Sequence, residues 1–350
     1  MMDTHFDMRD EIFGFVLDGS LEVLKKSYEA FSAQEVDWDM MDEEPAHTHT
    51  VAKTIDHAVE VSAPGTFWGK EIRNLRLEPS EKEGWWLNRA DLPDSQPVKV
   101  SIRNVWTTGD VVSNIVLRSG SSHNYVRLVE HIIALKAGMD VDNLVLSFEA
   151  SGDPPLFKKG SQDLVDALNE AGRKDVDTQV KYFTVKEKVS IVREDGSFLI
   201  IEPAEDGRMS LDLDCAVDFP TAIGKQRIKF PLNENTFNIG CQARTNTSFS
   251  KMLFCKTVGQ LFADIRNLGY NKENVLIAKK NSYWNEPALV HDGKCLESVW
   301  HRAILDLLAA IALIDEGRFV GKITSYKAGH FLDVEMVRLL STNDLFVEVK

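Results

Sequence analysis

The stretch that most constrains the fold runs from Glu297 to Leu313, where a histidine and an aspartate open a long apolar segment. Residues one turn apart share a face of an α-helix, so a pair that holds a metal usually has i, i+4 spacing. His301 and Asp306 are five residues apart instead, which an ideal helix places roughly 140° around its axis. Either this pair binds no metal, or the helix carries one extra residue as a π-bulge, a feature frequent at functional sites.

Two other stretches supply possible partners for this pair. Glu130 and His131 form a Glu-His dipeptide on an otherwise apolar helix, and a strand from Ile323 runs into a Gly-His turn that ends at His330. A catalytic zinc site uses three protein ligands, an open water position and a carboxylate base near that water. One interpretation makes His131, His301 and Asp306 the ligands and Glu130 the base. The other treats all of them as ordinary polar residues of helices.

Five motifs in one order resemble those of a known family, the UDP-3-O-acyl-N-acetylglucosamine deacetylases, which are zinc hydrolases of lipid A biosynthesis. That family carries a Val-Glu-His helix, a His-Lys-x-x-Asp helix and a Tyr-Lys-Ser-Gly-His turn, which the three stretches above resemble. The segments Asp218–Gln226 and Ala243-Arg244-Thr245 look like its aspartate/Ala-Ile-Gly-x-Gln and Ala-Arg-Thr motifs. The resemblance covers roughly Val51 to the C-terminus.

The resemblance implies an α+β fold of two similar β/α domains, two-layer sandwiches that face each other with their helices packed between two sheets. The polar stretch from Arg173 to Thr178 predicts the boundary between these domains. We therefore expect an N-terminal extension over residues 1–50, a first domain over 51–177 and a second over 178–350. Two β-then-α halves of similar size also suggest an internal structural duplication.

Hydrophobic periodicity and capping residues predict the individual elements. The N-terminal extension should hold a short helix from Leu21 to Phe31 capped by Ser20, then a solvated acidic linker that includes His47 and His49. Further helices are expected over 125–136, over 163–171 after Ser161, over 259–268, from His301 onward, and over 332–340. Strands are expected over 98–106, 143–149, 183–185, 189–192, 198–202, 209–213 and 319–323.

The resemblance also assigns roles to individual residues in amide hydrolysis. Glu130 would take the proton from the zinc-bound water, and Thr245 would help to stabilise the oxyanion. His330 would stabilise the oxyanion or protonate the leaving amine as a general acid. Arg302 stands at the position of the family's lysine. Contacts to the UDP-linked acylated amino sugar are expected from Phe67, Arg244, Tyr326 and Lys327.

Several positions depart from the family pattern. Arg302 replaces a lysine, Ala310 an aspartate that orients the catalytic histidine, and Phe67 a histidine, while one surplus residue separates His301 from Asp306. Loss of a group that orients a catalytic or ligand residue typically costs about 10–100-fold. Two interpretations follow: a divergent zinc deacetylase, or a catalytically weak or inactive paralogue that acts as a binding or regulatory protein.

Composition narrows the function further. A formal net charge of −14 argues against a general nucleic-acid-binding surface. The four cysteines lack Cys-x-x-Cys spacing, so neither a structural zinc nor a disulfide framework is indicated. With no signal peptide or membrane-spanning run, we expect a cytoplasmic monomer. An apolar groove for an acyl chain would still bring it near a membrane surface.

Overall fold

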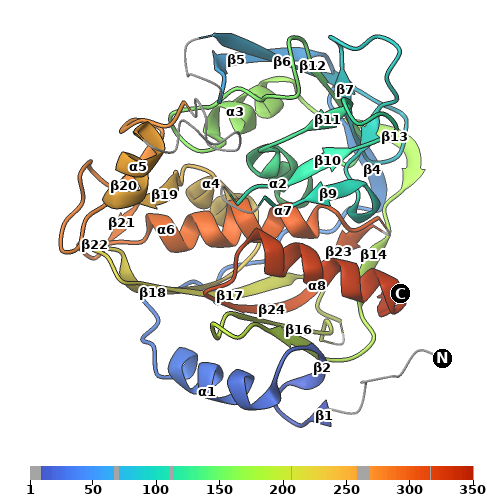
Figure 1. The fold of residues 1–350 in the computed structure, drawn as a ribbon. Coiled ribbons are helices and arrows are strands. Elements are labelled where there is room, and N and C mark those ends of the chain that lie inside the picture. The colour runs from blue at the N-terminus through green and yellow to red at the C-terminus, as the bar shows by residue number, and fades with distance from the viewer. Residues whose placement is uncertain are drawn as a thin grey trace.

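The computed structural model describes residues 9–66, 71–109, 113–205, 207–257, 269–315 and 317–349. Helices α2, α3, α6 and α7 lie between two β-sheets, and a further helix, α1, lies outside the lower sheet (Figure 1). The α+β architecture with helices packed between two sheets is therefore confirmed. The upper sheet has the order β5-β6-β12-β7-β8 and is built from β5 (Val59–Pro64), β6 (Ile72–Pro79), β12 (Leu144–Phe148), β7 (Trp85–Arg89) and β8 (Val98–Lys99).

The lower sheet has eight strands, and three of them come from the N-terminal segment. Its central strand β24 pairs with β17 in parallel and with β16 in antiparallel register. The order β1-β2-β15-β16-β24-β17-β18-β3 comprises β1 (Arg9–Asp10), β2 (Gly14–Asp18), β15 (Val189–Val192), β16 (Phe198–Glu202), β24 (Gly321–Tyr326), β17 (Leu211–Phe219), β18 (Gly224–Pro231) and β3 (Trp38–Asp39). The N-terminal strands thus complete both edges of the second half's sheet.

One broken helix runs through the middle layer, formed by α6 (Glu297–Trp300), a π-helical segment (His301–Leu307) and α7 (Leu308–Ile311). A Cβ on Gly240 would lie 2.2 Å from Ile304 Cγ1, so only glycine lets α4 approach the π-helical segment this closely. The other helices of this layer are α2 (Glu130–Gly138), α3 (Gln162–Glu170), α4 (Glu234–Gly240) and α8 (His330–Thr342).

Small sheets flank the middle layer on two sides. At the left of Figure 1, β19 (Thr245–Ser248), β20 (Val275–Ala278) and α5 (Phe249–Lys256) lie beyond α6. On the right, β4 (Val51–Thr54) pairs with β13 (Lys174–Gln179), and β14 (Tyr182–Val185) lies between β23 (Arg318–Phe319) and β25 (Phe346–Glu348). The remaining elements are η1 (Ile102–Asn104), β9 (Val105–Thr107), β10 (Val116–Arg118), β11 (Tyr125–Val126), β21 (Val290–His291) and β22 (Lys294–Cys295).

Three predicted elements differ from the structure for local reasons. The helix expected from Tyr125 begins at Glu130, because Leu128 adopts a φ of 53°, which a right-handed helix excludes. The strand expected over 98–106 is broken by η1, whose first turn is capped by the side chain of Ser101. The acidic linker contributes β3 to the lower sheet, so it is not simply solvated. The helix expected over 259–268 lies outside the described residues.

Helix α1 (Leu21–Ser32) covers the outer face of the lower sheet (Figure 1). The helix confirms the predicted one, although Ser20 occupies the N-cap position without a side-chain hydrogen bond. Phe31 is 2% exposed and packs against Phe198 and Tyr326 of the sheet, while the guanidinium of Arg227 lies 3.9 Å from its ring centroid. The N-terminal segment is therefore part of the folded core.

Two further expectations concern the whole chain. Within the described residues, no helix is both long and apolar enough to cross a membrane. Cys215, Cys241 and Cys295 are buried free thiols.

Truncation of Phe31 tests whether α1 belongs to the folded core. We expect Phe31→Ala to lower the free energy of unfolding, measured in urea, by about 3–5 kcal/mol, because it empties a buried aromatic site. Lys26→Ala, at an exposed position of the same helix, should change it by no more than about 0.5 kcal/mol. Equal, small effects of both variants would show that α1 is a detachable extension.

Candidate active site

The π-helical segment determines how His301 and Asp306, which are five residues apart, lie relative to each other. A π-helix closes its backbone hydrogen bonds between residues i and i+5, so it brings residues five apart onto one face. His301 is its first residue, and His301 Nδ1 lies 3.4 Å from Asp306 Oδ1. The π-bulge predicted from the spacing is therefore confirmed, and the surplus residue does not turn Asp306 away from His301.

The side chains of His131 and His301 meet between α2 and the π-helical segment. Their Nε2 atoms are 2.9 Å apart. The hydroxyl oxygen of Thr245, on β19, lies 3.3 Å from Nε2 of His131 and 3.1 Å from Nε2 of His301. Three residues distant in sequence thus converge on one point. The Ser161 hydroxyl, which donates to the His131 carbonyl at 2.6 Å, helps to fix the start of α2.

Asp306 joins a third histidine to this cluster. Its Oδ1 lies 3.3 Å from Nε2 of His330, the first residue of α8, as well as near Nδ1 of His301. Although buried, this oxygen accepts no hydrogen bond within the described part of the protein. Buried carboxylate oxygens without a hydrogen-bond donor are uncommon and call for an explanation such as a bound ion.

Glu130 is buried at the first position of α2. Its Oε2 accepts a hydrogen bond of 3.1 Å from the backbone N–H of Ile115, and the start of a helix favours a negative charge. Burial nevertheless raises the pKa of Glu130 above its ordinary value, against the opposing effect of the His330 charge. A carboxylate with a raised pKa is a stronger base than one in water.

His131, His301 and Asp306 differ in their preferred protonation states. Burial, together with the charge of His301, lowers the pKa of His131 to about 3, so its imidazole is neutral. Burial also disfavours the charged form of His301, but the neighbouring Asp306 outweighs it and raises the pKa of His301. Burial opposes ionisation of Asp306 as well, yet the charges of His301 and His330 hold its pKa well below the usual range.

The side chain of Arg244 binds Glu297 and does not point toward the histidines. Its Nε donates to Glu297 Oε1 at 2.7 Å, and its Nη2 donates to Glu297 Oε2 at 3.0 Å. The backbone N–H of Arg244 binds the same carboxylate, and so does that of Ala288. Arg244 was expected to contact substrate. In the structure its bidentate ion pair anchors β19, and with it Thr245, to α6.

Arg302 also points away from the histidines. Its Nη1 donates to Asp333 Oδ2 at 2.9 Å, and its Nη2 donates to Asp333 Oδ1 and to the Ser325 hydroxyl. Burial raises the pKa of Asp333 to about 6, although Arg302 acts in the opposite direction. Arg302, at the position of the family's catalytic lysine, thus holds the π-helical segment to α8 through this buried pair.

Two other residues expected to contact substrate, Tyr326 and Lys327, do not lie at the cluster either. Tyr326 alternates with Ser325 along β24 and packs on the outer face of the sheet against Phe31. Lys327 lies at the surface and donates to the Asp195 carbonyl at 3.3 Å, so it does not contact the histidines. Phe67 lies outside the described residues.

Sequence reasoning missed Glu297, Asp333 and Ser161 as parts of this site. A charged residue at an apolar position of a helix is a signal that could have found Asp333, since its neighbours in α8 are buried and apolar. Glu297 carries a similar signal at the start of an apolar helix. No sequence pattern indicates that Ser161 bonds a carbonyl on another helix.

The donor set fits a divalent metal, although the side chains are not all turned toward one point. Two facing imidazole nitrogens and a buried carboxylate are the ligand types of a catalytic zinc site. In the described residues, however, no three histidine, cysteine or acidic side chains surround one common position. Asp306 stands on the Nδ1 side of His301, away from the Nε2 pair.

Comparison with known proteins gives one consistent result. The family model of UDP-3-O-acyl N-acetylglycosamine deacetylase matches residues 52–342. A curated UDP-3-O-acyl-N-acetylglucosamine deacetylase from Syntrophus aciditrophicus is 28% identical over 290 residues, covering 82% of this chain and 85% of the relative. One of the same name from Brucella ovis is 27% identical over 299 residues, covering 85% and 97%.

Removal of the charge on Glu297 tests whether the Glu297–Arg244 ion pair holds β19, and with it Thr245, in place. Glu297→Gln keeps the side-chain volume but leaves the buried Arg244 without its counter-ion, so we expect it to cost about 3–5 kcal/mol of unfolding free energy. The control is Glu335→Gln, which removes a partner of Arg338 at an exposed ion pair of α8 and should cost less than about 1 kcal/mol. A Glu297→Gln variant as stable as the control would contradict the anchoring role.

Proposed function

Because the chain belongs to the UDP-3-O-acyl-N-acetylglucosamine deacetylase family, we propose that it is a zinc-dependent amidohydrolase of lipid A biosynthesis. Its substrate would be a UDP-3-O-acyl-N-acetylglucosamine or a close analogue, from which it removes the N-acetyl group. The observation that carries this proposal is the convergence of His131, His301 and Thr245 on one point, with Asp306 beside them.

In this proposal His131, His301 and Asp306 would hold Zn²⁺. The neutral imidazole of His131 and the ionised Asp306 are in the protonation states that metal ligands need. Bound zinc lowers the pKa of its water to about 7 and polarises the substrate carbonyl. Three protein ligands leave a position open for that water.

The protein's own residues then handle the protons. Glu130, whose pKa is raised by burial, takes a proton from the attacking water. The Thr245 hydroxyl, which lies at the meeting point of the two Nε2 atoms, donates to the oxyanion that forms. His330, whose Nε2 faces Asp306, gives a proton to the departing amine nitrogen. We also propose that this reaction takes place in the cytoplasm, where a UDP-linked substrate would be available.

A second candidate function is a binding or regulatory protein of weak or absent activity. It is favoured by the position of Asp306 on the Nδ1 side of His301, where the carboxylate orients two histidines instead of facing the Nε2 pair. Ala310, which stands at the position of a family aspartate, is fully buried and offers no polar group. The two candidates differ in whether the purified protein retains zinc.

Substitution of the proposed base separates chemistry from metal binding. We expect Glu130→Gln to slow hydrolysis of UDP-3-O-acyl-N-acetylglucosamine by about 10²–10⁴-fold, because the amide cannot accept the proton. The zinc content of the variant, measured by plasma mass spectrometry, should equal that of the unsubstituted protein. An unchanged rate would assign Glu130 a structural role only.

Metal content decides between the two candidate functions. We expect about one zinc per chain in protein purified without chelator, and loss of hydrolysis on dialysis against a chelator, restored by added zinc. His131→Ala should lose the metal, because it removes one of three ligands. His57→Ala, at an exposed position, should retain it. A folded protein that contains no zinc as purified, and that does not hydrolyse the substrate after zinc is added, would support the second candidate.

A further inference from the structure

A cavity that none of the clustered histidines lines lies at the C-terminal ends of α2 and α7. It has a volume of about 370 Å³, within the range of roughly 300–1,000 Å³ that is typical of small-molecule sites. Its walls include Lys136 near the C-terminal end of α2, Ile311 at the end of α7, and Tyr182 on β14. These strands and helix ends gather on the side of the molecule opposite β19 and α5 (Figure 1).

One part of the cavity wall is apolar, and the rest carries polar and charged residues. Leu211, Leu232, Ile311, Phe319 and Val320 all line it, and each of these side chains is less than 10% exposed. The mouth carries exposed residues of the N-terminal segment, among them Ala46. An apolar ligand body therefore finds a preformed surface here, because such walls favour transfer of apolar groups out of water.

Lys136 places a cation at the inner wall. Its Nζ donates to the backbone carbonyls of Ala312 at 2.6 Å and Ile314 at 3.3 Å, just past the end of α7. An ammonium group has three donors, so one remains beyond these two bonds. No carboxylate of the described residues forms an ion pair with Lys136. Burial lowers its pKa to about 8, which leaves it mostly protonated at neutral pH.

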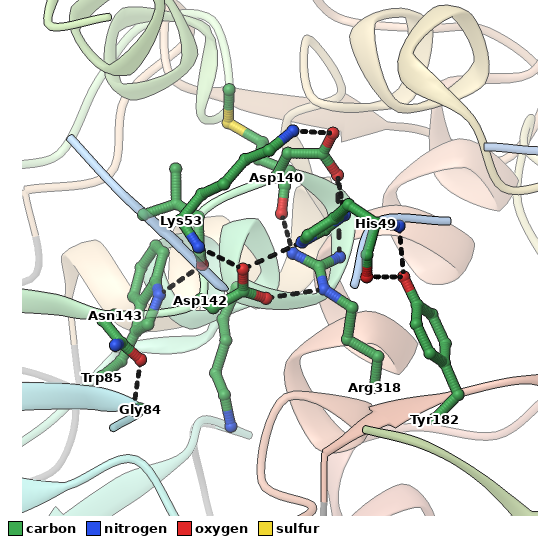
Figure 2. A network of polar contacts seen from close by, with 12 residues as sticks. His49, Lys53, Gly84, Trp85, Asp140, Asp142, Asn143, Tyr182 and Arg318 are labelled. Atoms are coloured by element: carbon green, nitrogen blue, oxygen red, sulfur yellow. Dashed lines mark hydrogen bonds and ion pairs between the residues drawn. The ribbon is translucent and has the colours of Figure 1, made fainter. Parts of the chain in front are cut away.

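Two of the acidic residues that line the cavity, Asp142 and Asp315, have other partners. Figure 2 shows Asp142 between His49 and Arg318: Asp142 Oδ2 is 2.9 Å from His49 Nε2, and Arg318 Nε donates to Asp142 Oδ1 at 2.8 Å. On the other wall, Asp315 accepts from Ser101 at 2.6 Å and pairs with Lys99 at 3.2 Å. Neither carboxylate forms an ion pair with Lys136, although the charges of both act on it. His49 is part of this network instead of a solvated linker.

We propose that this cavity binds a monocarboxylate with an unbranched apolar tail, whose carboxylate accepts a hydrogen bond from Lys136 while the tail packs against Leu211, Leu232 and Phe319. A single remaining donor matches a single acidic group. Asp140, Asp142 and Asp315 line the same cavity, and their charges disfavour a dianion such as a phosphate monoester. This proposal does not rest on the deacetylase activity.

Calorimetric titration of the full chain with decanoate, kept below its micelle concentration, tests the proposal. We expect one molecule of decanoate per cavity, bound at least about tenfold more tightly than decanol, which lacks the charge, or acetate, which lacks the tail. Lys136→Met keeps the length of the side chain without its charge and should weaken decanoate binding by at least about tenfold. Lys26→Met, at an exposed position of α1, should leave it unchanged.

A second variant tests the position of the bound ligand without changing Lys136. Ala46→Trp introduces a bulky side chain at the exposed mouth, away from the buried core, and should abolish binding of decanoate while the circular dichroism spectrum stays the same. Decanoate binding that survives both Ala46→Trp and Lys136→Met would locate the ligand elsewhere and overturn the proposal. Absence of any decanoate binding to the unsubstituted chain would overturn it as well.

Discussion

The i→i+5 turn that begins at His301 is the constraint on which the site depends. A regular helix would carry Asp306 about 140° around the axis from His301 and would place a different residue beside the histidine. The π-helical segment instead sets His301 Nδ1 and Asp306 Oδ1 3.4 Å apart. Helix α4 approaches this segment closely at Gly240, so the surrounding packing is shaped around the wider turn.

Two buried ion pairs hold the elements that carry the site. Glu297 and Arg244 join α6 to β19, and Arg302 and Asp333 join the π-helical segment to α8. A broken buried pair leaves an uncompensated charge and is strongly destabilising, whereas the intact pair adds little net stability. Their main effect is therefore positional: one fixes Thr245 and the other fixes the start of α8, where His330 lies.

The sequence predicted the elements whose signals are local. The lone His301–Asp306 pair at the start of an apolar run indicated the π-bulge, and the motif order indicated the family and the sandwich of helices between sheets. Directions of side chains were not predictable in the same way. Arg244, Arg302 and Tyr326 matched substrate-side motifs, yet each points away, because its partner (Glu297, Asp333 or Phe31) comes from a distant part of the chain.

The most direct test of the account is a crystal structure of the zinc-loaded protein with anomalous scattering measured at the zinc edge. The account predicts one anomalous peak about 2.0–2.1 Å from Nε2 of both His131 and His301, with Asp306 as the third protein ligand and the i→i+5 turn retained. A peak elsewhere, or a carboxylate of Asp306 that stays on the Nδ1 side of His301 with zinc bound, would contradict it.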